Sequence, residues 1–166
     1  MSDIATPSPE PPRRIDAIDR KILRVLQEDA SLSVAEIGER VGPSSTQCWK
    51  RVQRMENEGI ITGKVALVDQ NKIGLGLSVF VSVESDDHSD AWLKKFASAV
   101  SNMPEVIEFY RMAGDVDYVL RVVVADMLSY DIFYKKLISA VALKNVTSRF
   151  AMEKIKSVTA LPVPAF

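Results

Sequence analysis

The sequence has few of the residues that build disulfides, metal centres and catalytic sites. Its 166 residues include one cysteine, Cys48, and one histidine, His88. A lone cysteine excludes an internal disulfide and suits a reducing compartment, so we expect a cytoplasmic protein. Neither a nucleophile with its base nor a phosphate-binding loop is recognisable. We therefore expect no catalytic residue, no metal site and no cofactor.

Long apolar runs are also missing. No segment approaches the roughly 18 apolar residues that a membrane helix needs, so no membrane partner is expected. The first 14 residues lack the apolar stretch that is typical of a signal peptide. They hold four of the eight prolines. We expect residues 1–14 to be a disordered tail, with the fold beginning at Ile15.

A large net charge is absent, since the formal net charge is −1. The charges are unevenly distributed along the chain. Residues 13–64 carry ten basic and eight acidic side chains, whereas residues 65–166 carry eleven and twelve. Residues 44–55 contain three basic side chains and no acid. A local basic stripe matters more for a nucleic-acid partner than the global sum, so this composition permits DNA binding at one place.

Three short helices are predicted between residues 15 and 63. In the first, apolar residues recur with a period near 3.6 from Ile15 to Leu26, with Asp16 as a candidate N-cap. The second opens with Ser33 and Glu36, the spacing of a capping box in which each side chain accepts a backbone N–H of the first turn. A Gly-Pro pair at residues 42–43 ends it.

The third helix opens at Ser44 with a second box of the S-x-x-Q type. A helix followed by two capped helices with a tight turn between them is typical of a helix-turn-helix DNA-binding domain. We place this domain at residues 15–63. A helical wheel turns Cys48, Val52 and Met55 inward. The outward face then carries hydroxyl, amide and cationic groups, which are the groups that contact base edges and phosphates. The first turn adds free backbone N–H groups and the positive end of the helix dipole.

The candidate residues for contact with double-stranded DNA lie at the start of this helix or on its outward face. They are Ser44, Ser45, Thr46, Gln47, Trp49, Lys50, Arg51, Gln53 and Arg54. Any solvated amphipathic helix also carries polar residues outside, and this remains the alternative. Arg51, near the edge of the core, could instead pair with Glu36 or Glu39, and Trp49 could pack against the first helix.

After residue 63 the apolar pattern changes to a period of two. Residues 64–75 are predicted as a linker strand or hinge, and residues 76–166 as a second domain. In that domain we expect strands at 77–83, 105–112, 117–125 and 146–155, with helices around 92–100 and 130–141. The order β-α-β-β-α-β is that of a ferredoxin-like fold, so the whole chain is predicted to be α+β. Strand edges exposed by a four-stranded sheet indicate a homo-oligomer.

Short motifs from Ile15 to Pro162 carry a family resemblance. They are residues 15–23 (IDAIDRKIL), the R-V-x-R-M-E-x-x-G pattern of 51–59, and residues 73–74, 104–106, 114–118 (GDVDY) and 160–162 (ALP). With these motifs the chain resembles the Lrp/AsnC (feast/famine) family of transcription regulators. The resemblance implies a winged or extended helix-turn-helix joined to a ferredoxin-like domain for ligand binding and oligomerisation.

The resemblance also implies partners. Domains of this kind pair through their sheets into homodimers, homodimers commonly assemble into octamers, and amino acids bind between dimers. Within the family, residues 46–51, 63–67 and 150–153 are most similar to cysteine-responsive regulators. This similarity implies cysteine as the amino-acid effector.

A candidate effector site follows from the needs of a free amino acid, which requires an acceptor for its ammonium group and donors for its carboxylate. Asp115 and Asp117 follow Gly114 in a tight turn where backbone N–H groups are also available. A purely structural role in the turn is the alternative. The resemblance implies a pocket near this turn, the start of the last helix and the last strand. The candidate residues are Tyr110, Met112, Gly114, Asp115, Asp117, Asp126, Met127, Ser148, Arg149, Phe150 and Ala151.

The sequence therefore predicts a DNA-binding transcription regulator whose operator binding or assembly responds to a small amino acid. Two other functions remain as alternatives. One is an architectural protein that wraps DNA without ligand control. The other is an enzyme that acts on amino acids through the ferredoxin-like domain.

Overall fold

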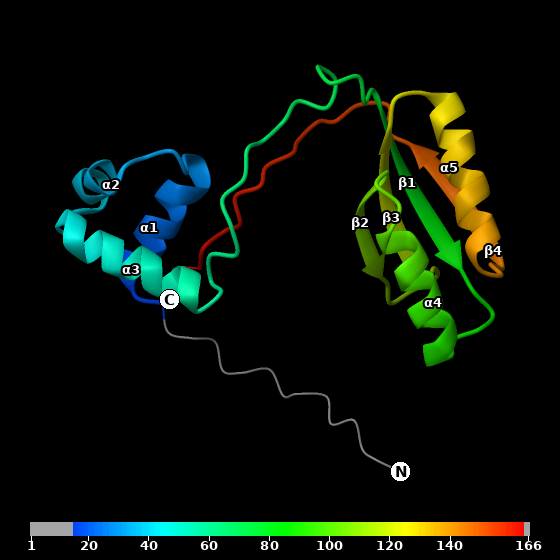
Figure 1. Ribbon diagram of the computed structural model, residues 1–166, viewed down its shortest axis with the longest axis horizontal. Helices are drawn as coiled ribbons and strands as arrows, with labels where there is room; N and C mark the ends of the chain where they lie inside the picture. The colour runs from blue at the N-terminus through cyan, green and yellow to red at the C-terminus, as the bar shows by residue number, and fades with distance from the viewer. Residues whose placement is uncertain (1–14, 165–166) are drawn as a thin grey trace, which may run out of the picture. The chain divides into compact units, whose positions relative to one another are not determined.

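The structure is a computed structural model that describes residues 15–164, and the expected disordered tail at residues 1–14 lies outside the described residues. The chain forms two compact units (Figure 1). The helical unit comprises the described residues up to Ala66 together with the segment from Ser157. The sheet unit comprises Leu67–Lys156.

Three helices build the helical unit, as the sequence predicts. They are α1 (Ala17–Glu28), α2 (Val34–Val41) and α3 (Ser45–Asn57). Burial of the thiol raises the pKa of Cys48, which keeps it protonated and unreactive. The apolar faces of the helices meet in one core of six buried side chains, namely Ile22, Ile37, Val41, Cys48, Val52 and Met55.

Capping interactions begin α1 and α2 where the sequence predicts. The Asp16 side chain accepts the backbone N–H groups of Ile18 and Asp19, and the Asp19 side chain accepts the Asp16 N–H in return. Ser33 and Glu36 form the same reciprocal box at the start of α2. Each box satisfies backbone donors that have no partner within the helix, so both starting points are encoded locally.

The turn between α2 and α3 is tight because two glycines allow it. Gly42 adopts φ +108°, a left-handed conformation that side chains disfavour. A Cβ atom at Gly38 would lie 2.9 Å from the Pro43 carbonyl oxygen, so a larger residue would push the turn away from α2. At the start of α3, Ser44 Oγ accepts the Gln47 N–H at 3.4 Å, which is one half of the predicted box.

The sheet unit has the predicted β-α-β-β-α-β order. The elements are β1 (Leu77–Glu84), α4 (Asp90–Ser101), β2 (Val106–Arg111), β3 (Tyr118–Val124), α5 (Met127–Ala140) and β4 (Asn145–Phe150). The four strands are antiparallel neighbours in the order β2-β3-β1-β4. This arrangement confirms the α+β class and the ferredoxin-like architecture. None of the helices among residues 15–164 is long and apolar enough to span a membrane.

The two faces of the sheet have different surroundings. On one face, Val79, Val81 and Val83 of β1 point into a core of fourteen buried side chains. Helix α4 contributes Phe96 to this core, and α5 contributes Phe133. Phe80 and Ser82 of the same strand point to the other face, because side chains alternate along a strand. Helices α4 and α5 do not cover that second face, which we call the open face, and Phe80 there is 42% exposed.

Two strand predictions are wrong. None of the described residues 58–76 is in a strand, so neither a linker strand nor the strands of a wing is present in that segment. A strand needs a hydrogen-bonded neighbour, whereas residues 62–69 are exposed. The last strand ends at Phe150 rather than near residue 155, because its partner β1 begins at Leu77 and the Ala151 N–H already bonds the Ser78 carbonyl.

The C-terminal segment returns to the helical unit. The side-chain amide of Gln27 in α1 donates to the Leu161 carbonyl oxygen at 3.2 Å and accepts the Leu161 N–H at 2.6 Å. Arg24 donates to the Val163 carbonyl oxygen at 3.3 Å. The sequence pattern predicts one domain over residues 76–166, whereas these contacts attach the segment from Ser157 to α1.

Candidate functional site

The outward face of α3 divides into exposed residues and residues engaged within the unit. Arg51, Gln53 and Arg54 are half-buried and donate to carboxylates of the helical unit, Gln53 to Glu56 at 2.7 Å. Trp49 is 52% exposed and is not part of the core of the helical unit. The exposed members of the predicted set are Ser44, Ser45, Thr46, Gln47, Trp49 and Lys50.

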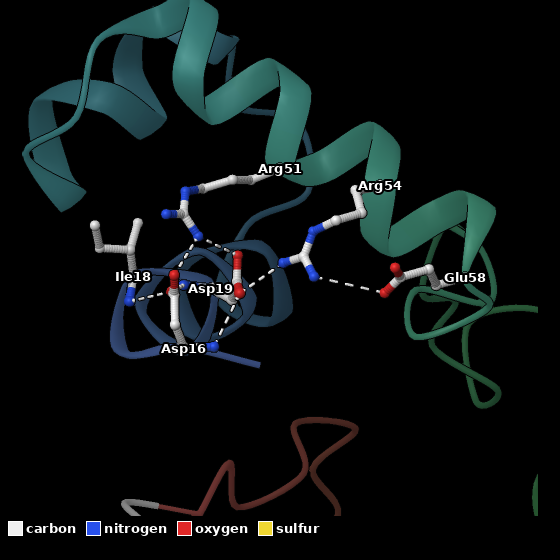
Figure 2. Close-up of polar contacts among 6 residues, drawn as sticks. All are labelled: Asp16, Ile18, Asp19, Arg51, Arg54 and Glu58. Carbon is white, nitrogen blue, oxygen red and sulfur yellow. Dashed lines mark hydrogen bonds and ion pairs between the residues drawn. The ribbon is translucent and has the colours of Figure 1, made fainter. Parts of the chain in front are cut away.

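A buried carboxylate of α1 holds the two arginines of α3. The Asp19 side chain is 1% exposed, and its Oδ1 accepts from Arg51 Nη1 at 2.8 Å while its Oδ2 accepts from Arg54 Nη2 at 2.6 Å (Figure 2). Oδ2 also accepts the Asp16 N–H at 2.9 Å. A buried charge requires such partners, and here they join the first turn of α1 to the middle of α3.

Asp16 takes part in the same network from the surface. Its Oδ1 caps α1 by accepting the N–H groups of Ile18 at 2.8 Å and Asp19 at 2.9 Å. Its Oδ2 accepts from Arg51 Nη1 at 2.7 Å, and the side chain is 53% exposed. The hydrogen bond from the Asp19 N–H, with the Arg51 guanidinium beside it, lowers the pKa of Asp16 from 3.8 to about 2. The carboxylate is therefore charged throughout the physiological pH range.

The network keeps all of its members charged. Burial acts to raise the pKa of Asp19, but the hydrogen bonds from the Asp16 N–H, Arg54 and Arg51 outweigh burial and lower that pKa. The hydrogen bonds to Asp19 raise the pKa of both arginines. Two cations of α3 thus meet two acids of α1, and Arg54 Nη1 also lies 3.6 Å from Glu58 Oε2 at the end of α3 (Figure 2). Lys50 is the third cation of α3, and it forms no ion pair with a residue in the described part of the chain.

A cavity of about 500 Å³ lies beside this network. It brings the exposed amide of Gln47 and the ammonium of Lys50 onto one surface with the arginines and the two acids. Such a surface offers cations to phosphates and amide groups to base edges. The lining residues are Asp16, Ile18 and Asp19 near the start of α1, Pro43 in the turn, and Gln47, Lys50, Arg51 and Arg54 in α3.

The partners of Arg51 differ from those expected. The sequence suggested Glu36 or Glu39, whereas Arg51 pairs with Asp16 and Asp19. Glu36 instead accepts the Ser33 N–H in the capping box of α2. A signal for the observed pairing was available, because Asp19 lies on the apolar stripe of α1 and a buried acid needs a cation.

The first group of predicted effector residues forms the turn between β2 and β3. The Met112 N–H donates to the Asp117 carbonyl oxygen at 2.8 Å and closes the turn. Asp117 Oδ2 accepts the Ser85 N–H at 2.8 Å, which attaches the turn to the end of β1. Gly114 adopts φ +148°, and Asp115 beside it is exposed. Asp117 therefore has a structural role, and Asp115 presents its carboxylate to solvent.

A second group lies where α5 begins beside β4. Asp126 caps α5 by accepting the Ser129 N–H at 2.8 Å, and this hydrogen bond lowers the pKa of Asp126. Ser148 Oγ and the Tyr130 hydroxyl group form a hydrogen bond. Phe150 packs edge-on against the Tyr130 ring, with 5.2 Å between the ring centroids. These contacts build a polar and aromatic cluster at one end of the sheet.

The strand register places the two groups at opposite ends of the sheet. Tyr118, which follows the turn, pairs with Val83 near the end of β1, whereas Phe150 pairs with Val79 near its start. One protomer therefore does not bring the predicted effector residues into one site. The remaining members are Tyr110 and Met127, which are exposed, Arg149, which donates to Ser82 Oγ at 2.7 Å, and Ala151, which donates to the Ser78 carbonyl.

Family models and relatives match both units. The AsnC-type helix-turn-helix domain matches residues 15–56, and the Lrp/AsnC ligand binding domain matches residues 78–161. The DNA-binding transcriptional activator DecR of Escherichia coli K12 is 52% identical over 90% of this chain and 99% of its own. The glutamate uptake regulatory protein of Zymomonas mobilis is 47% identical over 92% of this chain and 93% of its own.

Solved structures agree with these matches. The crystal structure of an AsnC family transcriptional regulator from Agrobacterium tumefaciens has a TM-score of 0.87 and 53% identity, covering 89% of this chain and 97% of that chain. A transcriptional regulator of Neisseria meningitidis in complex with L-methionine has a TM-score of 0.85 and 33% identity, covering 90% and 97%.

The matches cover both the helical unit and the sheet unit. At 47–52% identity, the relatives share more with this chain than the fold. The relatives are transcriptional regulators, which removes the enzyme from the alternatives. The chain belongs to the Lrp/AsnC family of DNA-binding transcriptional regulators.

Proposed function

We propose that this regulator binds operator DNA through the exposed start of α3 and that a small amino acid bound between protomers changes this binding. The observation that carries the DNA interface is the set of exposed polar groups beside an ion-pair network that engages both arginines of α3. Lys50 is the cation that remains to meet a phosphate or a guanine edge. Thr46 and Gln47 bring a hydroxyl and an amide in the first turn, where the helix dipole favours phosphate.

Lys50→Ala tests the DNA interface. We expect this variant to weaken operator binding by about 1–3 kcal/mol if Lys50 reads a base, as measured by gel-shift titration. Lys94→Ala is the matched control, since Lys94 is an exposed lysine on α4 of the sheet unit. Unchanged binding by Lys50→Ala would remove this residue from the interface.

We infer that the open face of the sheet pairs two protomers. Phe80 is 42% exposed and Tyr110 is 53% exposed on one protomer. In addition, the polar face of α3 is short, so two protomers are needed to specify an operator. Phe80→Glu should convert dimers to monomers in analytical ultracentrifugation. Leu128→Glu on α5, 69% exposed in one protomer, is the control and should leave the dimer intact. A dimer that survives Phe80→Glu contradicts this pairing.

The effector is proposed to be an amino acid held by residues of different protomers. The two groups of candidate residues lie at opposite ends of one sheet, which supports a site completed by a second copy. Regulators of Neisseria meningitidis and Mycobacterium tuberculosis have been solved with L-methionine. Cysteine is our first candidate, because the sequence resembles cysteine-responsive regulators. DNA and free amino acids are both cytoplasmic partners, so we place the protein in the cytoplasm.

A thermal-shift screen of the twenty amino acids tests the effector. A ligand that binds only the folded state raises the melting temperature, so a shift with cysteine supports the assignment. Asp115→Ala should abolish the shift and leave DNA binding intact, whereas Asp86→Ala, an exposed acid of another loop, should respond as the wild type does. No shift with any amino acid, together with binding to all DNA sequences, would favour the architectural alternative.

A further inference from the structure

The acids of α1 lie on the same surface as the residues of α3 that face DNA. Asp16 and Asp19 line the cavity together with Lys50, Arg51 and Arg54. An acid in such a place opposes phosphate, since it carries the charge of the nucleic acid. Asp19 has a structural reason to be there, because it is buried and joins α1 to α3. The second acid, which is exposed, needs a different explanation.

Asp16 divides its two oxygens between two tasks. Oδ1 caps α1, and a neutral asparagine or serine performs that task as well as an aspartate does. Oδ2 contacts Arg51 Nη1, which Asp19 Oδ1 already holds at 2.8 Å. The charge of Asp16 is therefore dispensable for the cap and supplementary for the attachment of Arg51. Its remaining effect is on the freedom of that arginine.

Figure 2 shows how the two acids restrain Arg51. Both carboxylates meet Nη1, and the other nitrogens of the guanidinium carry no contact with the residues drawn. A guanidinium whose Nη1 is held by two carboxylates presents its remaining N–H groups in one direction. An arginine held by one carboxylate alone has several accessible rotamers, because its side chain is long. It can therefore reach a phosphate wherever the helix lies along the DNA.

We propose that Asp16 is a specificity-determining residue that acts through Arg51, holding it away from phosphates in sequence-independent complexes while leaving it aligned for the operator. The proposal rests on the proposed use of α3 for DNA binding. Asp16 is a positioning residue, so its effect on specificity must disappear when Arg51 is absent. Its loss should strengthen binding to unrelated DNA more than binding to the operator, because only the unrelated complex gains a phosphate contact.

The test compares Asp16→Asn, which keeps the cap and removes the charge, with Glu28→Gln, which removes the same charge from the exposed far end of α1. The full-length protein is titrated with a random-sequence duplex and with the duplex that the wild type enriches from a random pool. For Asp16→Asn we expect roughly threefold to tenfold tighter binding to the random duplex, a smaller change on the enriched duplex, and a salt slope steeper by about 0.9 on the random duplex.

Arg51→Gln provides the second arm, because its amide retains a donor for Asp19 while the positive charge is removed. In this background Asp16→Asn should change the random-duplex affinity much less, because only the general repulsion between the acid and phosphate is removed, and the salt slope should stay unchanged. An effect of equal size in the absence of Arg51 overturns the proposal, as does an unchanged slope in Asp16→Asn alone. If Lys50→Ala also leaves all DNA binding unchanged, the α3 interface itself fails, which is distinguishable from a failure confined to Asp16.

Discussion

The helical unit and the sheet unit are held together by different interactions. The helical core contains six buried apolar side chains, whereas the sheet core contains fourteen, including Phe96 and Phe133. The helical unit adds the buried carboxylate of Asp19 with its two arginines. In the sheet unit, the pair of Arg121 and Glu108, at 2.8 Å, lies on the open face rather than in the core.

The difference follows from the size of the two cores. Apolar burial is non-directional, so a small core leaves the angle between helices weakly defined. Charge-assisted hydrogen bonds are directional, and those of Asp19 connect one point on α1 with two points on α3. We infer that polar contacts determine how α3 is oriented in the helical unit, whereas apolar packing determines the shape of the sheet unit.

The largest expected effect is in the sheet core. Phe133→Ala removes a side chain that is 0% exposed, and we expect a loss of about 3–5 kcal/mol in the free energy of unfolding. Urea denaturation in a Trp49→Phe background isolates the fluorescence of Trp92, which lies in this core. Ile138→Ala on the same helix is the control, since Ile138 is 45% exposed. Equal losses in the two variants would contradict the apolar account of this unit.

The second effect concerns the helical unit. Asp19→Ala should cost about 2–3 kcal/mol, less than the 3–5 of a wholly buried pair, because the arginines are 28% and 38% exposed and can be hydrated. Hydrogen exchange followed by mass spectrometry should show faster exchange in α1 and α3 and no change in β1. Protection that is unaltered in α3 would mean that the apolar core alone positions this helix.

A third, smaller effect is expected where the C-terminal segment meets α1. Gln27→Ala removes two hydrogen bonds to Leu161 and should cost about 1 kcal/mol. The same exchange experiment should show faster exchange of the Leu161 amide. Arg24→Ala, which removes one exposed bond at 3.3 Å, serves as the comparison and should change protection less. The reverse order would contradict the role assigned to Gln27.

The smallest effect is a dependence of stability on acid pH. The pKa of Asp16 is about 2 in the folded protein against its ordinary value of 3.8, so its contribution is complete above pH 3.8 and is lost as pH falls towards 2. Because the side chain is half exposed, we expect a loss below about 1 kcal/mol. Acid titration of the melting temperature should show a shallower decline for Asp16→Asn. Identical curves would contradict the ion pair.

Local patterns were sufficient to predict both architectures. Residues within a few positions of one another form the capping boxes at Asp16 and Ser33 and the tight turn after α2. These features can therefore be predicted from the local sequence alone. The alternation of β1 predicts a strand with one buried face for the same reason. The prediction of a linker strand within residues 64–75 was wrong because a strand depends on a neighbour that the local pattern does not reveal.

Contacts between distant segments needed the structure. Arg51 pairs with Asp19, which is 32 residues away in the sequence. The expected partners Glu36 and Glu39 are nearer in the sequence, but they do not pair with Arg51. The separation of the effector candidates likewise depends on strand order, which puts the β2-β3 turn and the start of α5 at opposite ends of the sheet. No periodicity in the chain encodes that distance.

The sequence by itself determined where the helices and the four strands of the sheet lie, which face of α3 is apolar, and the family to which the chain belongs. These properties depend on short-range hydrogen bonding and on the period of apolar residues. Only the tertiary structure decided which cations of α3 are engaged. The sequence separates only Arg51 from Lys50 and Arg54, by its position near the edge of the core. The packing of α1 against α3 places Asp19 within hydrogen-bonding distance of both arginines and leaves Lys50 exposed.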